Sequence, residues 1–232
     1  MSKTNLEILA YEHTPLGLLF LRRRELLSQP GTFVTEVTLN HEFLMSSLYT
    51  KSERVLAEHA LEMHTGQDLN VLVGGLGLGY TAQEALKSER VSQLEVIEFL
   101  PQVIRWTQEG LIPLSTELNN ESRLTLTCGD VFQRMLNPPT KQFDLILIDI
   151  DHSPEERLAD ANISFYSLPG LQAVQKHLQP GGILAVWSYA EDSPFAEALR
   201  RVFQEVSVVP VTYRNELINE KRTDWLFFAK GP

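Results

Sequence analysis

Four glycines after a short apolar run form the first group of residues with a chemical signature. The run Leu69–Val73 ends in Gly74, Gly75, Gly77 and Gly79, and the chain then enters a helical pattern. Closely spaced glycines allow turns that other residues avoid, and they let a ligand approach the backbone with no Cβ in the way. This loop therefore predicts a cofactor site.

Polar residues also follow the next two apolar runs. Glu98 ends the second run, where a carboxylate in a dinucleotide-type fold accepts hydrogen bonds from both ribose hydroxyls. Cys128, Gly129 and Asp130 follow the third run, where Asp130 can accept from an exocyclic amine such as that of adenine. Asp130 also suits the N-cap of a helix over Val131–Leu136.

Three ionisable side chains stand at the end of the fourth run. Asp149, Asp151 and His152 fall where open α/β sheets bind substrates. Asp149 is our candidate to accept a proton from an attacking amine or to orient that amine. His152 is an alternative base, because imidazole has an unperturbed pKa of ~6.5, and it also fits an exposed loop residue. A metal bound by these three side chains is a weaker alternative, since neighbouring strand residues point to opposite faces, and we predict no metal site.

The elements that position these residues alternate between apolar runs and helical patterns. Apolar continuity is typical of strands buried on both faces, and the helices supply the covering layers. The last two runs are joined by a connection too short for a crossover helix, so we expect an antiparallel pair at one edge of a doubly wound α/β sheet. The predicted strands are Leu69–Val73, Leu94–Ile97, Leu124–Thr127, Leu145–Asp149, Ile183–Trp187, Val206–Val211 and Asp224–Ala229. The predicted covering helices span residues 81–88, 101–110, 169–178 and 195–202.

Residues 1–50 have a different pattern and predict a small β-hairpin region. We therefore divide the chain into this N-terminal region and a cofactor-binding domain over residues 51–232. Apolar spacing over Ser47–Met63 predicts a helix leading into the main sheet. The basic run Arg22–Arg24 fits a solvated strand end or a partner-facing edge.

Charge and composition argue against several classes of function. The 232 residues include 20 Lys and Arg against 30 Asp and Glu, a net charge of −10. Such a field repels phosphate backbones and anionic lipids, so we expect no nucleic-acid or membrane partner. Cys128 is the single cysteine. We expect neither an export signal nor a membrane span, which needs ~18–20 apolar residues. A cytoplasmic protein is the resulting expectation.

In chain order, these motifs resemble class I S-adenosylmethionine-dependent transferases, and within them the spermidine synthase (polyamine aminopropyltransferase) family. The resemblance implies a Rossmann-like domain that binds S-adenosylmethionine or its decarboxylated form and alkylates a small amine-bearing acceptor. It also suggests a homodimer. By this resemblance Glu98 holds the ribose, Cys128–Asp130 the adenine, and Asp149 faces the amine. The matching motifs are Glu42-Phe43, the glycine loop, Glu98, Gly129-Asp130, Phe143-Asp144, Phe165-Tyr166 and residues 178–182.

The acceptor side of the predicted site is assembled from residues far apart in the sequence. We expect Met45, Asp151, Tyr166 and Trp187 to contact the acceptor, although Trp187 also fits a core position. Residues 152–166 have no strong periodicity and predict a flexible loop across the mouth of the site, which in the resembled family gates the substrate.

Three departures from the family pattern keep the reaction open. Leu78 stands where the family has an Asp that grips the amino acid end of the cofactor, Met45 replaces a Tyr near the amine, and His152 alters the loop after the fourth strand. Aminopropyl transfer, methyl transfer and cofactor binding without catalysis all remain hypotheses. A nicotinamide dehydrogenase is a weaker one.

Overall fold

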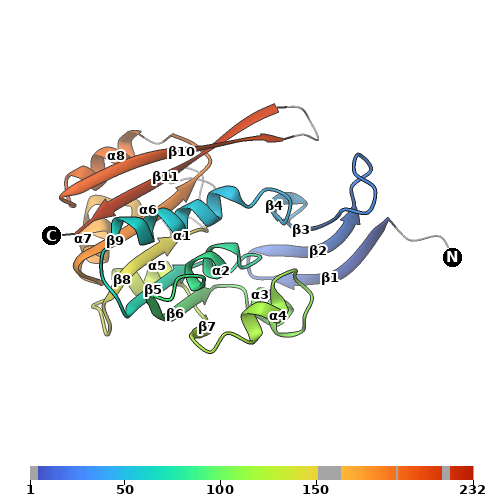
Figure 1. The fold of residues 1–232 in the computed structure, drawn as a ribbon, viewed down its shortest axis with the longest axis horizontal. Helices are drawn as coiled ribbons and strands as arrows, with labels where there is room; N and C mark the ends of the chain where they lie inside the picture. The colour runs from blue at the N-terminus through green and yellow to red at the C-terminus, as the bar shows by residue number, and fades with distance from the viewer. Residues whose placement is uncertain (1–4, 151–162, 192, 216–219, 232) are drawn as a thin grey trace.

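Two β-sheets organise the protein in a computed structural model that describes residues 5–150, 163–191, 193–215 and 220–231 (Figure 1). The strands are β1 (Leu6–Thr14), β2 (Gly17–Glu25), β3 (Phe33–Leu39), β4 (Glu42–Ser46), β5 (Leu69–Gly74), β6 (Val91–Glu98), β7 (Leu124–Cys128), β8 (Phe143–Ile148), β9 (Leu178–Ser188), β10 (Glu205–Asn215) and β11 (Glu220–Lys230). The helices are α1 (Lys51–Met63), α2 (Tyr80–Leu86), α3 (Pro101–Gln108), α4 (Ser115–Asn119), α5 (Val131–Leu136), α6 (Ile163–Tyr166), α7 (Leu168–Gln175) and α8 (Ser193–Arg200).

The larger sheet has seven strands in the order β10-β11-β9-β8-β5-β6-β7, and the smaller one has four in the order β1-β2-β3-β4. Strands β5 to β9 pair in parallel, whereas β11 pairs antiparallel with both β9 and β10. The predicted α/β fold, its antiparallel edge pair and the preceding β-region are confirmed.

A switch in strand order at β5 positions the site. The chain leaves β5 towards β6 and β7, and then returns to form β8 on the other side of β5. Ligands of open α/β sheets bind at such switch points, beyond the carboxyl ends of the strands. The glycine loop follows β5 and Asp149 follows β8, and the Asp149 N–H donates to the Gly74 carbonyl at 3.0 Å. The two main motifs of the sequence therefore lie side by side.

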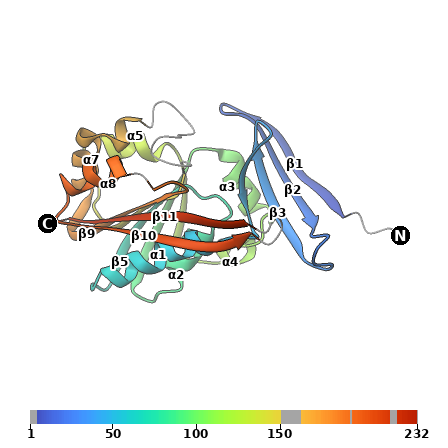
Figure 2. The same ribbon diagram turned by 90° about the horizontal axis from the view of Figure 1, so that it is seen from above.

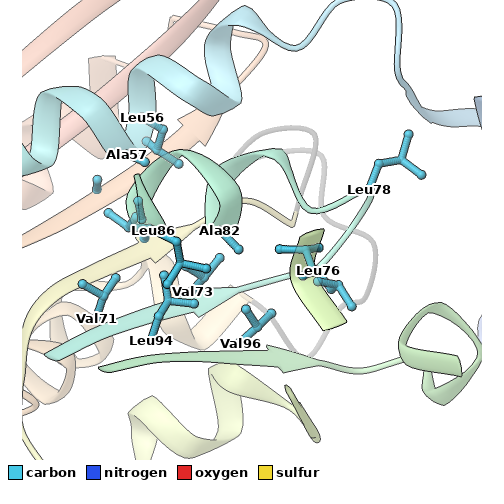
Figure 3. Packing of buried hydrophobic residues seen from close by; sticks show 14 of the residues in the cluster. Leu56, Ala57, Val71, Val73, Leu76, Leu78, Ala82, Leu86, Leu94 and Val96 are labelled. Atoms are coloured by element: carbon cyan, nitrogen blue, oxygen red, sulfur yellow. The ribbon is translucent and has the colours of Figure 1, made fainter. Parts of the chain in front are cut away.

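Apolar side chains hold helices on both faces of the large sheet. On one face, α2 packs over β6, and α1 packs against α2 and β9. Figure 3 shows apolar side chains of this face. Helices α5, α7 and α8 lie on the opposite face (Figure 2). Full burial of a Val or Leu side chain stabilises the fold by about 1.5–3 kcal/mol, so this core fixes the strand ends beneath the site. The labelled core residues of Figure 3 are Leu56, Ala57, Val71, Val73, Leu76, Leu78, Ala82, Leu86, Leu94 and Val96.

The predicted N-terminal β-hairpin region is a four-stranded antiparallel sheet. Strand β4 was not predicted, because the turn before it has no glycine. Asn40 and His41 instead adopt positive φ values of 51° and 72°. Two such residues in succession form the tight turn that joins twisted antiparallel strands.

Two further segments differ from their predictions. Helix α1 begins at Lys51 rather than Ser47, because Ser47 is bound to β3: its N–H donates to the Thr35 carbonyl and its hydroxyl accepts from the Thr35 N–H, both at 2.9 Å. The end of the predicted gating loop forms α6, and the rest lies outside the described residues. Within the described chain, no helix has the length and apolar character needed to cross a membrane.

Candidate functional site

A cavity of about 220 Å³ lies at the carboxyl ends of β5, β6 and β7. Gly75 and Gly77 line it from the glycine loop, Glu98 from the end of β6, and Gly129 and Asp130 from the end of β7. Each belongs to the set predicted to bind the cofactor. We call this space the smaller cavity.

The glycines are required by the shape of the loop. Gly75, Gly77 and Gly79 have φ values of 91°, 53° and 88°, which residues with a Cβ rarely adopt. A Cβ on Gly75 would lie 2.3 Å from the Asp149 carbonyl oxygen, and one on Gly77 would lie 3.3 Å from Met45 Sδ. A ligand can therefore come close to the backbone of this loop only because these three positions have no side chain.

Gly75→Ala should destabilise the protein and distort the smaller cavity, because both φ and space forbid a Cβ. Gly31→Ala is a matched control, since Gly31 has the same φ of 91° but no atom within 4 Å of the added Cβ. We expect Gly75→Ala to cost about 3 kcal/mol or more and Gly31→Ala about 1 kcal/mol, measured by urea unfolding. Equal losses would show that φ alone matters and that the contact with Asp149 does not.

Glu98 is buried, with only 8% of its surface exposed, yet it lines the smaller cavity. Its carboxylate accepts the N–H of Leu76 at 2.9 Å and of Leu100 at 2.8 Å. Burial raises the pKa of Glu98, and these backbone hydrogen bonds oppose that shift. Glu98 thus fixes the glycine loop against the start of α3, a role that the sequence analysis did not foresee.

The other residues predicted to bind the cofactor differ in whether they line the smaller cavity. Asp130 caps α5 as predicted, accepting the Gln133 N–H at 3.1 Å, and it also lines the smaller cavity. Gly74 is buried at the end of β5, beneath the loop. Cys128 is exposed at the end of β7 and is not among the residues that line the smaller cavity.

A second cavity, of about 580 Å³, adjoins the first. We call it the larger cavity. The two share Leu44, Met45, Gly77, Asp149 and Ile150 as lining residues. The space beside Asp149 is therefore where a molecule in one cavity meets a molecule in the other.

Besides Glu36 of β3, the larger cavity is lined by a group of three carboxylates: Glu53 from the first turn of α1, Asp149 after β8, and Asp224 from β11. Asp149 Oδ2 accepts the Thr81 hydroxyl at 2.6 Å, and Asp224 Oδ2 accepts the Ser52 hydroxyl at 2.6 Å. Because one wall holds all three acids, they destabilise one another's charged forms.

The pKa values follow from this crowding. Burial, and then repulsion from Asp224, raise the pKa of Asp149 to about 6. Burial, followed by the charges of Asp149 and Asp224, raises the pKa of Glu53 to about 8. The pKa of Asp224 is also raised, chiefly by burial. At neutral pH the wall is therefore partly protonated, and a cation entering the cavity would favour its full ionisation.

The same shifts make stability fall as pH rises. The pKa of Glu53 is about 8 in the folded protein against an ordinary value of 4.5, so the unfolded chain loses its proton first and the free energy of unfolding decreases between these pH values. Glu53→Gln should flatten this decrease and stabilise the protein at pH 8 by about 1–2 kcal/mol, or about 2–8 °C in Tm. Thermal unfolding of Glu53→Gln and of the parent protein between pH 5 and 8 measures this difference in Tm.

Glu58→Gln provides the control for that experiment, because Glu58 is an exposed carboxylate on the same helix. We expect its Tm to follow that of the parent protein at every pH. A Tm for Glu53→Gln that falls with pH as steeply as in the parent protein would contradict the assignment.

The predicted acceptor residues are only partly brought together. Met45 lines both cavities, and Trp187 lines the larger one, where its indole Nε1 is buried without a hydrogen-bond partner in the described structure. Tyr166 packs instead among aromatic rings, 5.9 Å from Phe132 and 5.4 Å from Phe195 between centroids. Asp151 and His152 lie outside the described residues. Glu53 and Asp224 were not predicted.

Comparison with protein families identifies the chain. The profile described as "Spermine/spermidine synthase domain" matches residues 50–211, which include both α1 and the whole parallel sheet. This protein belongs to the spermine/spermidine synthase family. Its family membership agrees with the resemblance found in the motifs.

Curated relatives in the family are similar over part of their length. A polyamine aminopropyltransferase of Clostridium acetobutylicum is 31% identical over 123 residues, covering 51% of this chain and 41% of the relative. One of Prochlorococcus marinus strain MIT 9313 is 32% identical over 134 residues, covering 57% of this chain and 43% of the relative. The chain thus spans less than half the length of these family members.

Solved structures share the fold. A spermidine synthase from Thermotoga maritima superposes with a TM-score of 0.73 at 15% identity, covering 97% of this chain and 72% of the other. A spermidine synthase in complex with the transition state analogue AdoDATO gives 0.75 at 16% identity, covering 97% and 74%. The N-methyltransferase NodS from Bradyrhizobium japonicum gives 0.56 at 18% identity, covering 78% and 97%. At these identities the comparison concerns the family fold alone.

Proposed function

We propose that this protein is a transferase that moves an alkyl group from S-adenosylmethionine, or its decarboxylated form, to a small amine. The observation that supports this most is the junction of the two cavities at Asp149. Glu98 and the glycine loop fit a nucleoside in the smaller cavity, and the carboxylates of the larger one fit an amine. Such a bound sulfonium would supply a carbon that is open to in-line displacement.

In the proposed step, the amine nitrogen forms a bond to that carbon while the carbon–sulfur bond breaks and its electron pair stays on sulfur. The nitrogen loses one proton, and Asp149 accepts it. With a pKa of about 6, Asp149 is ionised at neutral pH and able to take up this proton. Holding the reactants in line contributes up to ~7–11 kcal/mol in well-oriented systems, so positioning is the other main contribution of the chain.

Aromatic rings in the larger cavity also favour a cationic acceptor. Tyr49 and Tyr213 line it and stack with 5.2 Å between their centroids, and Tyr80 and Trp187 line it as well. A ring face attracts an ammonium group by about 0.5–2 kcal/mol. Rings and carboxylates together therefore support an amine substrate.

Methyl transfer is the second candidate, and Leu78 favours it. Leu78 is buried in the core, with 4% of its surface exposed, so the loop lacks the carboxylate typical of the family at this position. Incubation with each cofactor and a panel of amines distinguishes the two reactions. Release of methylthioadenosine from the decarboxylated form shows aminopropyl transfer, and release of S-adenosylhomocysteine shows methyl transfer. Binding of a cofactor with neither product would instead show a non-catalytic relative.

A further inference from the structure

Of the basic run Arg22–Arg24 in the N-terminal sheet, Arg24 lines the larger cavity. Arg22 and Arg24 of β2 both bind the Glu36 carboxylate of β3: Arg22 Nε lies 2.8 Å from Oε2, and Arg24 Nε and Nη2 lie 2.9 and 2.6 Å from Oε1. Arg22 and Arg24 are therefore ion-paired and about one-third exposed, at 35% and 29% of their side chains, whereas Arg23 is 51% exposed. We call the group the Arg22–Glu36–Arg24 cluster.

The cluster has an excess of positive charge. Its two guanidiniums, which keep their charge in proteins, share one carboxylate. Burial opposes ionisation of Glu36, but the hydrogen bonds from Arg24 and Arg22 outweigh burial and lower its pKa, so the carboxylate is ionised at neutral pH. One net positive charge remains. In a chain of net charge −10, this is an unusual feature for a cavity wall.

Within the cluster, Arg24 is the residue placed to meet a ligand. Arg24 and Glu36 line the larger cavity, whereas Arg22 is not among its lining residues. Arg24 Nη1 forms no hydrogen bond to any residue that the structure describes. The guanidinium therefore retains donors after binding Glu36, whose own side chain is only 6% exposed.

The larger cavity is consequently bipolar. Its group of three acids comes from α1, from the residue after β8 and from β11, which also contributes Arg222, and its positive cluster comes from the N-terminal sheet. A ligand that reaches from Asp149 to Arg24 would place a cation beside Asp149. A second cation at its other end would be repelled by Arg24. A carboxylate suits the second end, because guanidinium and carboxylate form strong paired hydrogen bonds.

We propose that Arg24 is a specificity-determining residue that binds the carboxylate of a ligand in the larger cavity. This rests on the proposed function. The carboxylate belongs either to an amine acceptor of amino acid type or to the amino acid tail of S-adenosylmethionine. Both sources present the same carboxylate. Two pairs of ligands, one pair for the cofactor and one for the acceptor, distinguish the sources, because the members of each pair differ in the carboxylate.

The test compares Arg24→Met with Arg22→Met, which removes the other guanidinium from the same Glu36. Calorimetry with S-adenosylmethionine and its decarboxylated form examines the cofactor tail. Steady-state kinetics with 4-aminobutanoate and butylamine examine the acceptor. We expect Arg24→Met to weaken the binding of one carboxylated ligand about tenfold or more and to change that of its counterpart without the carboxylate less than twofold. Arg22→Met should change neither. Loss on S-adenosylmethionine identifies the tail, and loss on 4-aminobutanoate identifies the acceptor.

Other outcomes overturn the inference. Equal effects on carboxylated and uncarboxylated ligands, or equal effects of the two substitutions, would show that Arg24 has only a structural role. Failure of the parent protein to bind either cofactor would reject the proposed function together with the inference, whereas transfer that is independent of Arg24 would reject the inference alone. If Arg24→Met does not fold, Arg24→Lys keeps the charge but loses the planar fork and should show the same selectivity in weaker form.

Discussion

Asp149→Asn should reduce kcat by about 10²–10⁴ and leave the affinity for the cofactor within a few-fold. The amide cannot accept the amine proton, but its oxygen can still accept the Thr81 hydroxyl that now lies 2.6 Å from Asp149 Oδ2. The geometry should therefore persist while proton acceptance is lost. Kinetics and calorimetry on the same preparation separate the two effects, because a reduced kcat with unchanged binding assigns Asp149 to the transfer step.

The pH profile and a matched variant sharpen this prediction. The ionised form of Asp149 is the active one, so kcat/KM of the parent protein should fall as pH decreases through about 6, and this limb should vanish in the variant. Asp144→Asn is the control, since Asp144 lies on β8 but binds the Asn70 N–H at 2.8 Å and is not a lining residue of either cavity. Unchanged turnover in Asp149→Asn would remove the catalytic assignment.

Glu98→Ala should weaken cofactor binding by about ten- to a hundredfold, because hydrogen bonds to a charged group contribute about 1.5–3 kcal/mol. Two effects combine: the carboxylate expected to hold the ribose is removed, and the Leu76 and Leu100 N–H groups that it accepts lose their partner. The glycine loop should then lose its fixed position. Calorimetric titration measures the affinity, and thermal unfolding reports the accompanying loss of stability.

Glu95→Ala is the control for Glu98, as both carboxylates lie on β6. Glu95 binds Arg134 at 2.6 Å and is not a lining residue of the smaller cavity, so its loss should affect stability without a specific loss of affinity. Equal affinities for the cofactor in Glu98→Ala and the parent protein would contradict the role of Glu98.

Local patterns made much of the lining of the smaller cavity predictable from the sequence. The glycine loop, Glu98 and Asp130 each follow an apolar run directly, and parallel strands bring their carboxyl ends to one edge of the sheet. No knowledge of distant contacts is needed for that inference. The doubly wound fold and the edge pair were predictable for the same reason, since strand and helix periods differ along the chain.

Long-range pairing made the charged lining of the larger cavity unpredictable. Glu53 has the sequence pattern of an ordinary first-turn acid, and only the fold brings its helix beside Asp224, where Ser52 and Asp224 are bonded across 172 positions. Arg22 and Glu36 meet because β2 and β3 pair in one specific register. That register is set across the connection over residues 26–32, where the Leu26 N–H donates to the Thr32 carbonyl at 2.8 Å, and no local pattern of residue types specifies which side chains it places opposite one another.

The most direct test of the transferase assignment is calorimetric titration of the purified protein with S-adenosylmethionine, decarboxylated S-adenosylmethionine and methylthioadenosine, each alone. We predict one-site binding of at least one sulfonium compound and of methylthioadenosine, both weakened by Glu98→Ala. Tighter binding of the decarboxylated form would favour aminopropyl transfer, and tighter binding of S-adenosylmethionine would favour methyl transfer. Absence of binding for all three compounds would contradict the proposed function.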